Sequence, residues 1–227
     1  MRDRAGPRRT PAGEKLLRHA QTLEALEAEY LGAADAPVGS VRVAGFSSVT
    51  RSLVMPALAP LLRRKPYPCT VLTRELGALP ELLRQGEADF LVTEGESERE
   101  DVNSSFLGFE ENVLVRARRV KAPEIYLDHD PLDTITARYF QRIKRKLERR
   151  FLDDIYGLLD GVKLGLGLAV LPRHLVAGDK DLEIVDEARV LRIPVWLHYL
   201  HQPYYPRFQE EVRAALETHF RARLPQR

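Results

Sequence analysis

The chain of 227 residues is long enough for one or two domains with a sizeable core, and its 44% hydrophobic and 30% charged residues are typical of a folded globular protein. Its 35 basic and 33 acidic side chains give a formal net charge of +2, which neither requires nor excludes nucleic acid as a partner. The single cysteine, Cys69, excludes an internal disulfide and any metal site built from several cysteines. The sequence has no apolar run of bilayer length, and no apolar stretch follows the basic opening MRDRAGPRR, so we expect a cytoplasmic protein without a membrane partner.

The first predicted element is an amphipathic helix over residues 11–32. Thr10 and Pro11 form a helix start, and Gly32 is a typical stop before a linker over 33–40. The apolar residues recur at gaps of three and four and form one narrow seam: Leu16, Ala20, Leu23, Leu26 and Tyr30. Such a seam needs a partner, either the rest of the chain or a second copy. We favour a second copy, because the helix precedes the core and a linker separates the two.

The next segments alternate short apolar runs with helical patterns. We expect strands over 40–46, 69–76 and 88–95, with helices over 52–64 and 78–87 between them. This β-α-β-α-β order with short connections predicts a parallel sheet with right-handed crossovers. An acidic loop over 94–101 and a fourth strand over 109–118 follow.

The remainder predicts a second α/β unit. We expect a strand over 124–130, a strongly basic helix over 134–151, another helix over 153–165 and a buried strand over 166–172. Strands over 181–186 and 192–200 are expected to return toward the first unit, and a helix over 205–224 ends the chain. The fold class is therefore α/β.

Three stretches resemble the LysR-type transcriptional regulators. The segment over 39–95 resembles the first half of their effector-binding domain, with Gly45 after a strand, a hydroxyl-bearing turn, a helix with Pro56, and Gly86 and Asp89 ahead of an apolar strand. LLDGVKLGLGLAVLPRHLV over 158–176 is similar to that family's GxGxAxLP strand, which is the most specific match. RTPAGEKLLRHAQTLEAL over 9–26 resembles the start of its linker helix.

The resemblance implies two Rossmann-like lobes of the periplasmic-binding-protein type 2 kind, joined by two crossing strands and preceded by the linker helix. Lobe 1 would comprise 40–116 and 191–227, and lobe 2 would comprise 117–190. Residues 11–32 would form the dimerisation helix, and residues 1–10 a disordered remnant of the winged-helix tail. Ten residues cannot build the family's winged helix-turn-helix, so DNA binding is expected only through a missing N-terminal domain. Three interpretations fit this departure. The chain is a truncated regulator, its reading frame was started late, or it is a free-standing sensor that forms mixed dimers with a full-length relative.

Candidate effector-binding residues in the first lobe follow two strands. Ser47, Ser48 and Thr50 come after the first strand, where a helix N-terminus and hydroxyl groups form an anion site beyond the carboxyl end of a strand. Thr73, Glu75 and Leu76 come after the second strand and are expected to face the same cleft. The alternative is that one of the hydroxyls simply caps the helix.

The second lobe contributes a more acidic set of candidates. Asp128, His129 and Asp130 follow its first strand, Thr134 begins the next helix, and Asp153 or Asp154 opens the following one. We favour the interpretation that these acids are N-caps and turn residues; the functional alternative is that they bind a cationic group of the ligand. His129 between two carboxylates would titrate near neutrality or serve only as a turn residue.

The basic helix is interpreted as a solvated face or as a contact in a homodimer or tetramer. Its candidate dimerisation residues are Arg138, Arg142 and Arg145, facing the helix over 52–64 or the acidic loop of a second copy. It lacks the context of a DNA-reading helix.

Catalysis has little support in the sequence. It contains no nucleophile elbow, P-loop or metal triad, and His198 and His201 lie in a strand-like stretch with the wrong periodicity for one metal. We therefore expect no cofactor, no metal and no enzymatic activity, but a small-molecule effector that changes how subunits are arranged and so controls transcription. The alternatives are a two-lobe solute-binding protein and an enzyme on the same scaffold.

Overall fold

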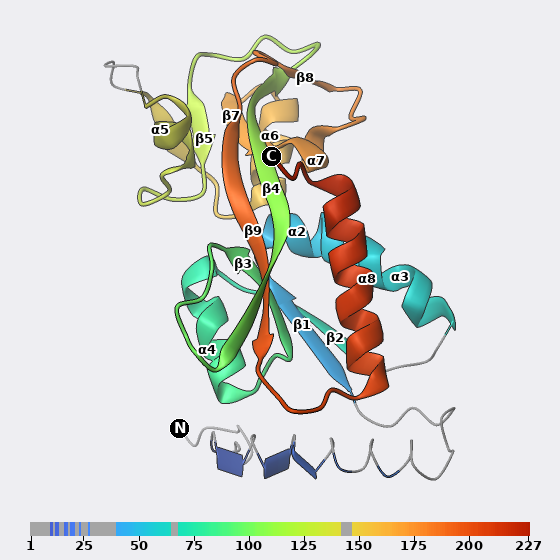
Figure 1. Cartoon of the computed structure of the whole chain (residues 1–227). Helices are drawn as coiled ribbons and strands as arrows, with labels where there is room; N and C mark the ends of the chain where they lie inside the picture. Colours follow the sequence, from blue (N-terminus) through green and yellow to red (C-terminus); the bar gives the residue numbers. More distant parts are fainter. Residues whose placement is uncertain are drawn as a thin grey trace, which may run out of the picture. The chain divides into compact units, whose positions relative to one another are not determined.

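The structure is a computed structural model that describes residues 10, 12, 13, 16, 17, 19, 20, 23 and 27, and then 40–64, 68–141 and 147–227. It divides into two compact units, shown in Figure 1. Unit 1 comprises 1–106 and 196–220, and unit 2 comprises 107–195 and 221–227, so the chain passes from one unit to the other after Phe106, Val195 and Phe220. Strands β4 (Val102–Ala117) and β9 (Leu191–Leu200) each contribute to both units.

Unit 1 is built on the predicted parallel sheet. Strand β1 (Val41–Gly45) pairs in parallel with β2 (Cys69–Thr73) on one side and with β3 (Phe90–Glu94) on the other. Val41 and Val43 lie on one face of β1 and Ala44 lies on the other, and all three are buried because helices cover both sides of the sheet. In Figure 1, α4 (Leu79–Gln85) lies on one side of these strands, and α3 (Met55–Arg64) and α8 (Arg207–Arg223) lie on the other.

The helix after β1 begins earlier than the sequence predicts. It starts at α2 (Ser47–Val49), passes through a π-helical turn over Thr50–Val54 and continues as α3, so helical structure runs without a break from 47 to 64. The expected start at residue 52 is therefore wrong by five residues. A short 3₁₀ turn, Leu76–Ala78, leads into α4, which ends at Gly86 in the left-handed conformation that glycine adopts most easily.

Unit 2 has a mixed sheet. Strand β5 (Tyr126–Asp128) pairs in parallel with β6 (Arg149–Phe151) and β7 (Leu168–Pro172), and β4 pairs antiparallel with β7 and with β8 (Leu182–Ile184). Helix α6 (Ile155–Lys163) and the short α7 (Arg173–Val176), which the sequence did not predict, complete this unit. Strand β8 lies in unit 2, although the sequence suggested that it returns toward the first unit.

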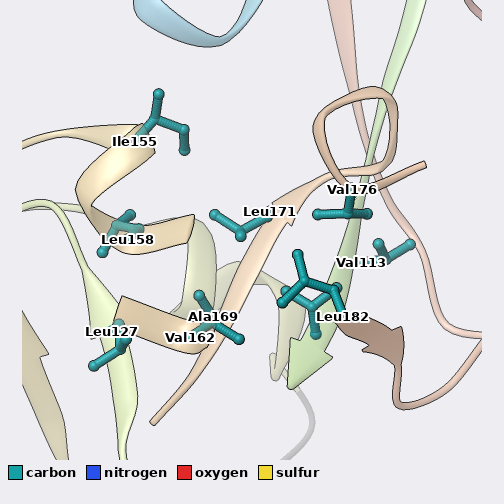
Figure 2. Packing of buried hydrophobic residues seen from close by; sticks show 10 residues of the cluster. Val113, Leu127, Ile155, Leu158, Val162, Ala169, Leu171, Val176 and Leu182 are labelled. Atoms are coloured by element: carbon teal, nitrogen blue, oxygen red, sulfur yellow. The ribbon is translucent and has the colours of Figure 1, made fainter. Parts of the chain in front are cut away.

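Alternating residues divide the core of unit 2 between the two faces of its sheet. Val113, Leu127, Ala169 and Leu171 pack with α6 in one cluster, and Figure 2 shows these strand side chains grouped with Ile155, Leu158 and Val162 of that helix. The intervening Leu114, Tyr126 and Val170 pack with Tyr139 and Phe140 in a second cluster. This period of two is the pattern of a strand that is covered on both faces.

The predicted basic helix over 134–151 is wrong as one element. Helix α5 covers only Ile135–Tyr139, and Arg149–Phe151 is strand β6, paired with Tyr126–Asp128. Helix formers are abundant in this stretch, but pairing with β5 and the buried carboxylate of Asp128 outweigh local helix propensity at its end.

Candidate functional site

The carboxyl end of β1 leads directly into the N-terminus of a long helix. No side chain caps this helix, since its N-cap residue is Phe46. Thr50 donates from its backbone N–H and from Oγ1 to the Phe46 carbonyl oxygen, at 3.0 and 2.8 Å, and is buried. Ser48 is also buried, and its carbonyl oxygen accepts a hydrogen bond from the Ser52 hydroxyl. Ser47 is half-buried, and its hydroxyl has no partner within the described ranges. The capping alternative is therefore wrong for these three residues.

The residues predicted after β2 lie beside this helix start. The register pairs Gly45 with Thr73, and the backbone N–H of Arg74 donates to the Gly45 carbonyl oxygen at 3.2 Å. Thr73, Glu75 and Leu76 are all exposed. The structure thus brings both predicted groups of unit 1 to one edge of its sheet, where a helix N-terminus offers N–H groups to an anion.

A buried histidine, which the sequence analysis did not select as a site residue, lies near the carboxyl end of β3. His198 of β9 is 4% exposed; its Nε2 lies 3.1 Å from both the Gly95 carbonyl oxygen and Thr93 Oγ1, and its Nδ1 lies 2.9 Å from Ser104 Oγ. A carbonyl oxygen can only accept, so Nε2 carries the proton and Nδ1 accepts from the Ser104 hydroxyl. Burial lowers the pKa of His198, opposed by the Gly95 carbonyl and the charge of Glu96.

In unit 2, the predicted acid Asp128 is part of a buried ion pair. Its carboxylate accepts from Thr136 Oγ1 and from Arg149 Nε, and its side chain is 3% exposed. Burial raises the pKa of Asp128, and the bonds from Thr136 and Arg149 oppose this rise. Arg149 also donates from Nη2 to the carbonyl oxygens of Asp133 and Asp130, at 2.7 and 3.2 Å.

The other predicted residues of this loop serve local structure. Asp130 Oδ1 accepts from the backbone N–H groups of Leu132 and Asp133, at 2.6 and 3.1 Å, which is an Asx turn. Half-buried His129 donates its backbone N–H to Asp133 Oδ2 at 3.3 Å. Thr134 is exposed and forms no capping bond for α5.

The acids that open α6 follow the same pattern. Asp154 caps the helix by accepting from the Gly157 N–H at 3.0 Å, and Asp153 is exposed. Asp130 and Asp154 thus act as a turn residue and an N-cap, as the turn-and-cap interpretation anticipated, whereas Asp128 pairs with Arg149, which that interpretation did not anticipate.

A polar cluster that the sequence analysis missed lies at the carboxyl end of β7. Glu110 of β4 is 3% exposed, and its Oε1 lies 2.9 Å from Nε2 of His174 in α7, the short helix that follows β7. The neighbouring Glu111 pairs with Arg173 and Arg192, at 3.1 and 3.0 Å. Two glutamates inside the apolar run FEENVLV were the available signal, because a carboxylate in a buried strand needs a specific partner.

The predicted dimerisation residues are described only in part. Three of them are helical and exposed: Leu16 (69% exposed), Ala20 and Leu23 (47% exposed). Arg138 is half-buried at the end of α5. Leu26, Tyr30, Arg142 and Arg145 lie outside the described residues.

Within the described ranges, no group of three or more His, Cys, Asp or Glu side chains is arranged to hold a metal ion. In the same ranges, no helix is both long enough and apolar enough to cross a membrane. The arrangement presents N–H groups, hydroxyls, carboxylates and imidazoles at strand ends, which suits recognition of a small polar molecule.

Solved structures share this fold. LysG from Corynebacterium glutamicum, a full-length LysR-type regulator with the effector Arg bound, superposes with a TM-score of 0.75 at 17% identity, covering 98% of this chain and 83% of LysG. ArgP from Mycobacterium tuberculosis gives 0.73 at 20% identity, covering 99% and 83%. The C-terminal domains of a LysR family protein from Agrobacterium tumefaciens give 0.69 at 15% identity, covering 83% and 99%.

No curated protein sequence matches the chain. The model of the LysR substrate binding domain matches residues 34–221, most of the chain. This match confirms the α/β fold of the periplasmic-binding-protein type 2 kind, and its family consists of transcription regulators rather than enzymes. The chain belongs to the LysR substrate-binding domain family.

Proposed function

We propose that this chain is the sensing part of a cytoplasmic transcription regulator and that it binds a small metabolite with a carboxylate group. The carboxylate is bound at the N-terminus of the helix that begins at Ser47. The observation that carries this assignment is the helix start itself, which has no side-chain cap and lies beside exposed Thr73. Free N–H groups and a positive helix end stabilise an anion at this position.

Unit 2 offers further candidates for recognition of a small molecule. Asp128 and Asp154 already have partners, so half-buried His129 and exposed Asp153 are better candidates there. The structurally similar LysG was solved with Arg as its effector, which makes amino acids the first class to test.

Binding would act on the arrangement of subunits. An effector changes the balance between two arrangements only by its difference in affinity for them. The exposed Leu16 and Leu23 fit a helix that pairs with a second copy, and a DNA-binding domain preceding this segment would read out the change.

A thermal-shift screen of the chain with L-arginine, L-lysine, neutral amino acids and dicarboxylates tests the ligand. We expect at least one to raise the melting temperature by mass action and to be recovered unchanged. Ser47→Trp and Thr73→Trp should abolish the shift. Thr70→Trp is the matched control, because Thr70 is also an exposed threonine and lies toward the amino end of the same strand. A shift that survives Ser47→Trp contradicts the assignment, and so does conversion of the ligand.

Light scattering tests the pairing of the leading helix. Leu16→Glu with Leu23→Glu should reduce the molar mass to that of one chain, because charges replace the apolar seam. His19→Glu, on the same helix and also exposed, is the control and should leave the mass unchanged. An unchanged mass in the leucine variant would exclude this dimer contact.

A further inference from the structure

A cavity of about 730 Å³ lies within unit 2, and none of the candidate effector residues lines it. Its volume is within the range of small-molecule sites, roughly 300–1,000 Å³. Tyr126 and Leu168, the first residues of β5 and β7, line it. Those strands are parallel and end at Asp128 and Pro172, so the cavity lies at the opposite edge of the sheet from the candidate effector residues.

The floor of the cavity is apolar and aromatic. Leu114, Tyr126 and Phe140 belong to the second core cluster and are 7%, 3% and 7% exposed. The Tyr126 and Phe140 rings meet edge to face, with centroids 5.1 Å apart. Such a floor favours the apolar or aromatic body of a ligand.

The wall is basic and is formed mainly by the connection between β4 and β5, with Arg116 of β4 and Glu183 of β8. Four cationic and two acidic side chains line the cavity. Glu183 pairs with Arg116, and Glu124 accepts from the Tyr126 hydroxyl at 3.3 Å. Arg119 and Lys121, by contrast, have no hydrogen-bond or ion-pair partner in the part of the chain that the structure describes. Two cations next to an apolar floor therefore lack counter-charges.

Two glycines of the family-like motif hold this connection in place. A Cβ at Gly165 would lie 2.5 Å from Val120 Cγ1, and one at Gly167 would lie 2.4 Å from the Ile125 carbonyl oxygen. The same oxygen accepts from the Leu168 N–H at 2.8 Å. These contacts hold the backbone of the loop close to β7 on both sides of Lys121, so the loop presents the exposed Arg119 and Lys121 side chains at the rim of the cavity.

We propose that this cavity is a second ligand site that binds a small amphipathic anion: an aromatic or branched aliphatic carboxylate, sulfonate or phosphate. The anionic group contacts Arg119 and Lys121, and the apolar body lies on Tyr126 and Phe140. The site is independent of the proposed effector site, because its residues come from the other edge of unit 2.

Fluorescence titration of the whole chain with 1-anilinonaphthalene-8-sulfonate, an aromatic sulfonate, tests this site. Arg119→Glu with Lys121→Glu should weaken binding at least tenfold. Arg63→Glu with Arg64→Glu is the matched control, because it places the same charges on an exposed pair of arginines of α3 and should change affinity less than twofold. Equal affinity in the two variants, or an equal loss in both, would overturn the proposal.

A second comparison separates the apolar contribution from the charge. Ala122→Phe fills part of the cavity and keeps every charge, so it should also weaken probe binding. Naphthalene-1-sulfonate should displace the probe, whereas methanesulfonate at the same concentration should not. Displacement by both anions would indicate a charge patch without a cavity site and would contradict the proposal. Ser47→Trp should leave binding of the probe unchanged. Failure of the proposed effector site can therefore be distinguished from failure of this second site.

Discussion

The two units place similar polar residues at the ends of parallel strands but use them differently. In unit 1, Ser47 and Thr73 lie at an uncapped helix start with few internal partners. In unit 2, the corresponding acid Asp128 is buried against Arg149 and Thr136. The difference teaches that position at a strand end does not by itself make a ligand group. The local partners decide whether a side chain is available for binding or already belongs to the fold.

Removal of Arg149 should have the largest effect on stability. Arg149→Met leaves the Asp128 carboxylate buried without its cation, which costs about 3–5 kcal/mol. Chemical unfolding at pH 7 measures this loss. Asp128→Asn combined with Arg149→Met should lose less, because no charge stays buried. Since burial already raises the pKa of Asp128, the loss in Arg149→Met should also shrink toward acidic pH, where the folded state takes up a proton.

The next largest effect is expected at Gly167. Gly167→Ala places a methyl group against the backbone oxygen of Ile125, and we expect a loss of about 2–3 kcal/mol in the free energy of unfolding. Gly77→Ala is the matched substitution in unit 1, where a Cβ would meet nothing within 4 Å. That variant should be neutral or more stable by about 0.5 kcal/mol. Similar losses in both variants would contradict this close approach.

The same isosteric substitution, threonine to valine, can be made in each unit to compare how much a buried hydroxyl contributes to stability. Thr136→Val removes a hydrogen bond to a carboxylate and should cost about 1.5–3 kcal/mol. Thr50→Val removes the hydrogen bond from the Thr50 hydroxyl to the Phe46 carbonyl oxygen. That oxygen still accepts from the Thr50 backbone N–H, so the free energy of unfolding should fall by only about 0.5–1 kcal/mol. Thermal unfolding gives both values. If Thr50→Val costs more, the hydroxyls of unit 1 contribute to the fold at least as much as those of unit 2.

The smallest predicted effect is a pH dependence from His198. Its folded pKa lies below the ordinary value of 6.5, so as the pH falls through about 6.5 the unfolded chain binds a proton that the folded chain does not. The unfolding free energy therefore decreases below pH 6.5, by at most about 1.4 kcal/mol per pH unit. His198→Gln should therefore make the free energy of unfolding fall less between pH 7.5 and 5.5 than it does in the parent chain. Unfolding at both pH values, with His201→Gln as the control, checks this.

Much of the fold follows from patterns in the sequence. The three strands of unit 1 are recognised by apolar runs bounded by turns, and their parallel order follows from the helices between them. The strand at the end of the basic segment cannot be recognised from such a pattern. Arg149 suits a helix locally and forms a strand only because it pairs with Tyr126 and contacts Asp128. Local propensity contains no information on such a distant partner.

The candidate site was predictable to a similar extent. Ser47 and Thr73 follow from the rule that ligands bind beyond the carboxyl ends of strands, and register then places them at one edge. The pair of Glu110 with His174 was missed, because 64 residues separate the partners and only the antiparallel register of β4 and β7 brings them together. The cavity beside Tyr126 depends on how the connection between β4 and β5 passes over Gly165 and Gly167. The periodicity of the sequence does not predict such a contact.

The three passages of the chain between the units have a consequence for dissection experiments. Strand β4 belongs to both units, and residues 221–227 return to unit 2, where the Pro225 carbonyl oxygen accepts from the Phe109 N–H at 2.8 Å. No single cleavage can therefore release either unit as an intact fragment. Trimming the last few residues would remove the bond from Pro225 to the Phe109 amide, more than one hundred positions upstream. A tail that looks dispensable in the sequence therefore forms part of the second unit.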